Sequence, residues 1–117
     1  MIAEETQISA LVTDWSKIES EQTAPGITRQ MVVGQNVMMV RFTFEPFLET
    51  PQHTHPHEQM TVVVKGRVKF FVRGVEHIVS AGSVLHFPPH ILHGATMMEE
   101  EVVLIDIFSP IREDFLI

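Results

Sequence analysis

The stretch 51–66 constrains this chain more than any other part of it. It places His53 and His55 two positions apart, Gln59 four positions later, and an apolar run that ends at Gly66. Side chains at positions i and i+2 of an extended strand point to the same face, so two imidazoles and the Gln59 amide can converge on one point. Either half of a metal site or a polar, histidine-rich loop is consistent with this spacing alone.

A second stretch, residues 82–93, supplies a further histidine. Gly82 opens a short apolar strand, Pro88 and Pro89 end it, and His93 follows the turn. A ligand from a second strand favours the metal site over the polar loop, because metal centres in proteins gather nitrogen and oxygen donors from different elements.

Length, charge and cysteine content bound the class of protein. The 117 residues fit one domain with one hydrophobic core. We expect a core of about 30–109, an N-terminal arm of 1–25 and a C-terminal tail of 110–117. The net charge of -7 offers no basic surface for nucleic acid or anionic membranes. The lack of cysteine excludes disulfides and thiolate ligands, and it fits a reducing cytoplasm. No signal peptide or membrane-spanning run is apparent, so we expect a cytoplasmic protein.

Alternating apolar and polar residues predict many short strands. The expected strands are 27–33, 37–44, 60–64, 67–72, 75–79, 84–87, 91–97 and 102–108. Lys65-Gly66 and Arg73-Gly74 are expected to form tight hairpins, because glycine tolerates positive φ. The spacing of Ser16 and Glu19 predicts one helical turn near residues 15–18. Few helix signals and regular turns favour an antiparallel sandwich or barrel.

The two histidine-bearing stretches resemble the two motifs of the cupin family. The matching features are His53-x-His55, the six residues between Gln59 and Gly66, Gly82-x5-Pro88, and His93. The resemblance spans about residues 30–109. It implies an all-β fold, the double-stranded β-helix or cupin jelly-roll barrel, with a metal inside.

Four positions depart from the family motifs. Gln59 stands where the family has glutamate, and His90 stands where the second motif has glycine. Met97 replaces an asparagine, and Phe47 replaces the first glycine.

The expected ligands of one divalent transition metal are His53, His55, Gln59 and His93. Nitrogen and oxygen donors without sulfur suit zinc, nickel, iron, manganese or cobalt, and affinity does not choose among these metals. Three imidazoles and one amide cancel none of the cation's charge, which favours an anionic substrate and a stronger Lewis acid.

The other histidines are weighed separately. His57 shares the parity of the ligands, and we expect it at the rim of the site. His77 is expected on the surface, and ordinary packing or rim positions are expected for His86 and His90.

The last strand carries a second group of candidate residues. Leu104, Asp106 and Phe108 share one face by parity, and an acid in such an apolar run is costly to bury unless it has a partner or a function. Asp106 could simply pair with a base for stability. Arg112 lies just beyond, and its planar fork suits a carboxylate.

Residues 53–59 together with 106–116 are similar to the pectin-degradation cupins of KdgF type. That resemblance implies an enzyme that converts 4,5-unsaturated uronates, the products of pectate and alginate lyases, into linear 5-keto sugars. It assigns catalysis to Asp106 and Arg112, and sugar contacts to Phe108 and Arg112. Ile111 departs from the commoner Pro-Pro at this place.

Two other functions remain open, and both use the same fold. A cupin dioxygenase would bind oxygen at the three-histidine site. A non-catalytic sugar-binding cupin ranks last, because such proteins usually carry a helical DNA-binding domain. We expect a small anionic sugar as partner, and no nucleic acid or membrane. Apolar residues on the outside of the barrel favour a homodimer: Phe71, Val103, Ile105 and Ile107.

Overall fold

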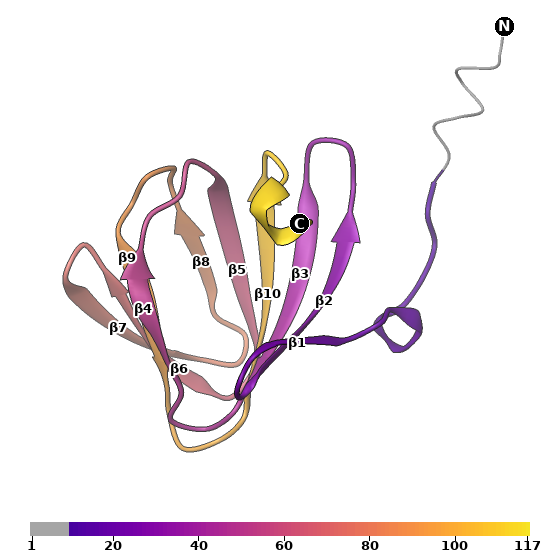
Figure 1. Cartoon of the computed structure of the whole chain (residues 1–117). Coiled ribbons are helices and arrows are strands. Elements are labelled where there is room, and N and C mark those ends of the chain that lie inside the picture. The colour runs from indigo at the N-terminus through magenta and orange to yellow at the C-terminus, as the bar shows by residue number, and fades with distance from the viewer. Residues whose placement is uncertain (1–9) are drawn as a thin grey trace, which may run out of the picture.

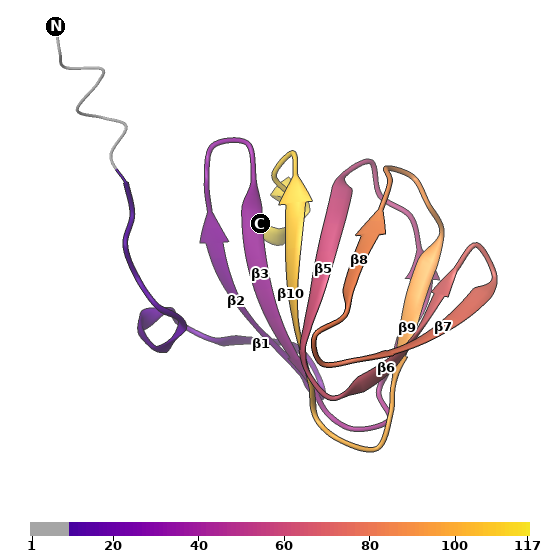
Figure 2. The same cartoon turned by 180° about the vertical axis from the view of Figure 1, so that it is seen from behind.

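The computed structural model describes residues 10–117, and its strands form two antiparallel sheets. The strands are β1 (Glu21–Ala24), β2 (Ile27–Val33), β3 (Met38–Phe44), β4 (Glu49–His53), β5 (Glu58–Lys65), β6 (Arg67–Val72), β7 (Val75–Ser80), β8 (Val84–Phe87), β9 (His93–Met97) and β10 (Val102–Ser109). The six-stranded sheet has the order β1-β2-β3-β10-β5-β8, and the four-stranded sheet has the order β4-β9-β6-β7. Figures 1 and 2 show the sheets converging at one end and diverging at the other.

The core lies between the two sheets, toward the end where they converge. Its buried residues alternate along the strands, as the pattern of β3 and β10 predicts: Phe44, Val63, Val68, Phe70, Phe87, Ala95, Met97, Val102 and Leu104. Polar side chains occupy the same inward face nearer the other end of the strands, where Gln59 lies opposite Phe108 and His53 lies opposite His93. The apolar end therefore holds the sheets together and leaves the diverging end for a site.

The predicted all-β class and jelly-roll architecture are confirmed. Strands 27–33, 67–72 and 84–87 match β2, β6 and β8 residue for residue. Two strands were missed, β1 and β4, because their short polar sequences lack alternation. They form through pairing with β2 and β9 instead. β9 begins at His93, two residues later than expected.

The prediction of a hairpin at Lys65-Gly66 is wrong. β5 pairs with β10 and β8, whereas β6 pairs with β7 and β9, so the chain changes sheets at this corner. Gly66 has φ of 88° and packs against the backbone of Glu101. Glycine marked the turn correctly, but it does not specify which strands pair.

The prediction of a hairpin at Arg73-Gly74 is confirmed. Val72 pairs with Val75, and the two residues between them have φ of 51° and 78°, as a two-residue hairpin loop requires.

A helical turn forms at Trp15–Lys17, as expected, but the expected cap is wrong. Asp14 caps it by accepting a hydrogen bond from the backbone N–H of Ser16. The first nine residues of the expected N-terminal arm lie outside the described residues. Within residues 10–117 the helical segments are two three-residue turns, far short of a membrane span.

One of the four residues expected on the outer surface is covered. Val103 is only 4% exposed, although Thr43 opposite it belongs to the outward face of β3. Phe71, Ile105 and Ile107 are partly exposed.

The corner at Gly66 generates a stability prediction. A Cβ at position 66 would lie 2.6 Å from the Glu101 carbonyl oxygen, whereas one at Gly74 would meet nothing within 4 Å. Both glycines have positive φ, so Gly74→Ala isolates the cost of backbone strain, about 1–2 kcal/mol. We expect Gly66→Ala to lower the free energy of unfolding by about 2–4 kcal/mol, because steric overlap adds to that strain. Urea unfolding of both variants measures the difference, and equal losses would contradict the corner packing.

Candidate functional site

Three histidines gather at the diverging end of the barrel. His53 ends β4, His93 opens β9, and the two residues are direct partners across the sheet. His55 follows in the loop before β5. One ring nitrogen of each histidine lies within 4.8 Å of the others. His55 and His93 are buried, whereas His53 is exposed. The structure thus brings together the three histidines that the sequence singled out.

Each of these rings is oriented by a hydrogen bond to a backbone carbonyl two residues away. The Nδ1 atoms of His53, His55 and His93 lie 3.0, 3.1 and 2.9 Å from the carbonyl oxygens of Pro51, His57 and Ile91. A carbonyl oxygen only accepts, so each Nδ1 carries the proton and donates it. In the neutral rings, Nε2 is therefore left with a lone pair, which is the state that a metal ligand needs.

The Gln59 amide is oriented by a chain of hydrogen bonds. The Thr61 hydroxyl donates to Oδ1 of Asp106 at 2.7 Å, and it accepts from Nε2 of Gln59 at 2.9 Å. This places the amide oxygen of Gln59 toward His55, where it lies 3.0 Å from Nε2.

Two acceptors therefore face each other at the centre of the site. The only ring proton of neutral His55 is donated to the His57 carbonyl, so Nε2 and the Gln59 oxygen have no hydrogen between them. A cation would satisfy both lone pairs. The donor set consequently fits a divalent metal, and this fit depends on the orientation of each group rather than on the count of histidines.

Burial keeps two of the imidazoles, those of His55 and His93, neutral. It lowers the pKa of His55 to about 4, with the nearby Arg112 cation contributing in the same direction. Burial also lowers the pKa of His93, partly opposed by the bond to Ile91. Metal binding competes with protons for these nitrogens, so low pKa values favour binding at neutral pH.

Asp106 is buried next to this cluster. It projects from β10 into a cavity of about 330 Å³ whose lining also includes His53, Gln59, His93 and Phe108. Burial raises the pKa of Asp106 to about 6, and the Thr61 hydrogen bond opposes the shift. A carboxyl group with this pKa can exchange a proton near neutral pH.

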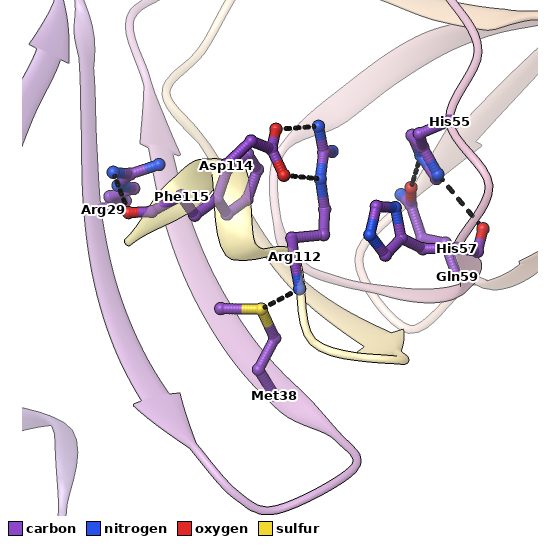
Figure 3. Close-up of polar contacts among 8 residues, drawn as sticks. All are labelled: Arg29, Met38, His55, His57, Gln59, Arg112, Asp114 and Phe115. Atoms are coloured by element: carbon purple, nitrogen blue, oxygen red, sulfur yellow. Dashed lines mark hydrogen bonds and ion pairs between the residues drawn. The ribbon is translucent and has the colours of Figure 1, made fainter. Parts of the chain in front are cut away.

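Arg112 reaches the cavity from the C-terminal tail. Its guanidinium donates to Asp114 through Nε at 3.3 Å and Nη2 at 2.8 Å (Figure 3). It also lies 5.1 Å from the ring centre of Phe108 and 4.1 Å from that of Phe115. Its side chain is 13% exposed. The rings of Phe108 and Phe115 and the Asp114 carboxylate therefore hold the guanidinium of Arg112 at the cavity wall.

The remaining histidines lie outside the three-histidine cluster. His57 is partly buried, and its ring lies 5.5 Å from that of His55. His77 is exposed, and His86 forms an exposed contact of 2.7 Å with Glu58.

His90 is exposed but contributes through its backbone. It has φ of 65°, which explains why the family motif has glycine here, and its N–H donates to the His55 carbonyl. Histidine accepts this conformation more readily than most residues do.

Sequence reasoning missed three residues of the site. Thr61 shares the parity of Gln59 along β5, so the pattern could have revealed it. Arg29 interrupts the inward face of β2 between two apolar residues and donates to the carbonyl of Phe115 at 3.0 Å. Phe115 carried no periodic signal, because its position depends on the fold of the tail.

Comparison with known proteins gives consistent results. The model of the cupin domain family matches residues 40–108. The chain is 33% identical over 98 residues to the pectin degradation protein KdgF of Dickeya dadantii (strain 3937), covering 82% of this chain and 89% of that protein.

Two solved structures extend the likeness to the fold. An RmlC-like cupin from Shewanella frigidimarina is 36% identical with a TM-score of 0.85, over 92% of this chain and 96% of that one. KdgF from Halomonas sp. is 28% identical with a TM-score of 0.87, over 92% and 99%. The matched sequence, the barrel and the three-histidine cluster agree, and the chain belongs to the cupin family as a relative of the pectin degradation protein KdgF.

Proposed function

We propose that this protein is a metal-dependent isomerase that converts 4,5-unsaturated uronates into linear ketonised sugars. The observation that carries the proposal is Asp106, a buried carboxyl with a raised pKa in the same cavity as His53 and His93. Relatives named for pectin degradation support the substrate class, because pectate and alginate lyases release such uronates.

His53, His55, Gln59 and His93 would hold one divalent metal: zinc, nickel, iron, manganese or cobalt. When bound, the metal supplies a Lewis acid that stabilises negative charge on a substrate oxygen. The all-neutral ligands leave its charge available to an anion.

Asp106 would perform both proton transfers. An unsaturated uronate is an enol ether whose ring closes through a hemiacetal at C1. Asp106 takes the proton of the C1 hydroxyl, the bond between C1 and the ring oxygen breaks, and C1 becomes an aldehyde. The electron pair stays on the former ring oxygen as an enolate of C4 and C5. The same carboxyl then delivers its proton to C4, which leaves a ketone at C5. Acid/base help of this kind contributes ~10²–10⁴ in rate.

Arg112 and Phe108 would bind the sugar. Asp114 occupies the Nε side of the Arg112 guanidinium, so Nη1 remains able to donate to the substrate carboxylate. Phe108 offers an aromatic face in the same cavity.

The experiment that tests the function follows the ultraviolet absorbance of the enol ether after lyase-made unsaturated uronates are added. Loss of absorbance with one ketone formed per substrate is expected. No turnover, together with oxygen uptake on other substrates, would favour a dioxygenase. Sugar binding without turnover would favour a non-catalytic cupin.

We also propose that the protein is a cytoplasmic homodimer whose chain forms one cupin domain over residues 1–117. On the outer face of the six-stranded sheet, Met60 is 48% exposed and lies opposite the partly exposed Ile107, and Val84 is 68% exposed and lies opposite Val62. Sedimentation of the purified protein measures the oligomeric state, and a monomer at micromolar concentration would contradict this assembly.

The metal site generates the first functional prediction. The purified protein should contain one divalent transition metal per chain by elemental analysis. His93→Ala should lose most of this metal, because the Nε2 of His93 belongs to the three-histidine cluster. His57→Ala is the matched control and should keep its metal. Equal losses in both variants would show that the ligands are assigned wrongly.

A second prediction concerns Asp106. Asp106→Asn keeps the acceptor for Thr61 but cannot transfer a proton, so kcat should fall at least ~10²-fold with metal content unchanged. The raised pKa means that burial disfavours the ionised carboxyl. At pH values above about 6 this charge costs stability, so the melting temperature of the variant at neutral pH should be equal or higher. A lower melting temperature with full activity per folded molecule would assign Asp106 a structural role instead.

A third prediction concerns Arg112. Arg112→Lys keeps the charge but loses the planar fork, so KM for the uronate should rise roughly 10-fold or more while kcat falls less. Steady-state kinetics measure both constants. Loss of metal or of folding in this variant would indicate that the cation mainly supports the Phe108–Phe115 corner.

A further inference from the structure

The Thr61 hydroxyl connects a candidate metal ligand, Gln59, to Asp106 through hydrogen bonds. Among the described residues it is the only hydroxyl group that does so. Its side chain is fully buried, and β5 places it directly opposite Asp106 on β10. The hydroxyl accepts from the Gln59 amide at 2.9 Å and donates to Asp106 at 2.7 Å.

The direction of this relay is fixed by proton counting. A hydroxyl has one hydrogen, and an ionised Asp106 can only accept, so the Thr61 hydrogen points to Asp106. Thr61 must then accept its second bond, and the Gln59 NH₂ group is the donor that faces it. The relay holds Oδ1 of Asp106 in place at the wall of the cavity. It also holds the Gln59 oxygen toward His55.

A glutamate at position 59 would break this order. It has no N–H to donate, so the Thr61 hydroxyl would lie between two carboxylates and could donate to only one of them. Asp106 would lose the hydrogen bond from Gln59, keep the one from Thr61 for only part of the time, and gain a like charge nearby. A carboxylate oxygen nevertheless remains a good ligand for a divalent metal.

We propose that Thr61 is a positioning residue for Asp106, and that position 59 carries an amide rather than a carboxylate because the amide N–H supports the proton-transfer step while the amide oxygen remains a metal ligand. This inference rests on the proposed function, in which Asp106 is the acid/base. It explains why glutamine stands at a position where the cupin motif has glutamate.

The test compares three substitutions on the full-length, metal-loaded protein. Thr61→Val removes the hydroxyl at nearly constant volume, and kcat should fall about 10- to 100-fold with KM nearly unchanged, because Arg112 is untouched. Thr61→Ser restores the hydroxyl and should recover most of kcat. Gln59→Glu should keep one metal per chain by elemental analysis yet lose kcat to a similar extent.

Two controls separate this role from general effects. Thr43→Val makes the same chemical change on the outward face of β3, and it should leave kcat and metal content unchanged. In an Asp106→Asn background, Thr61→Val should cause no further loss of kcat, because the proton transfer that Thr61 positions is already absent.

Distinct results overturn the inference and the function. Normal kcat in Gln59→Glu, or a Thr61→Ser variant as slow as Thr61→Val, would refute the relay. If Thr61→Val does not fold, Thr61→Ser and Gln59→Glu decide the question, with melting temperature and metal content measured beside turnover. An active Asp106→Asn protein would instead refute the proposed mechanism, whatever the Thr61 variants do.

Discussion

Three neutral imidazoles can share one point only if none of their protons is directed at it. The fold meets this condition because each Nδ1–H donates to a backbone carbonyl two residues away in sequence. The Nε2 lone pairs are then available to a metal, and burial keeps two of the rings neutral by lowering their pKa values. The pairing of His53 with His93 brings the two stretches of sequence together, so the site depends on backbone geometry as much as on its side chains.

The charges in the cavity follow a second requirement, that a buried acid must lie near a cation without being neutralised by it. Arg112 already donates hydrogen bonds to Asp114. Its charge lowers the pKa of Asp106 only slightly. Desolvation therefore prevails, and the carboxyl titrates near neutrality. A direct ion pair between Asp106 and Arg112 would have held the acid ionised and removed its use in proton transfer.

The sequence predicted the fold class and most strands, because these depend on parity along a strand. It singled out the three histidines through their motif spacing, although His53 ends β4 and His55 lies in the loop that follows. Alternation placed Met38, Val40, Phe42 and Phe44 on one face of β3, and the structure buries all of them except the partly buried Phe42. Pairing between distant strands left no such local signal. The corner at Gly66, the short strand β4 and the burial of Val103 all depend on which strands meet. Thr61 was overlooked because a threonine in an apolar strand is common on either face.

The position of β10 has a consequence for how the protein is made. This strand is synthesised after the other nine strands described, yet it lies between β3 and β5 in the middle of the six-stranded sheet. Until it arrives, β1-β2-β3 and β5-β8 are separate pieces, each with an open edge at the place where β10 will insert. The barrel closes only when the segment that carries Asp106 enters the sheet, so closure of the fold and completion of the acid/base site are a single late event on the nascent chain.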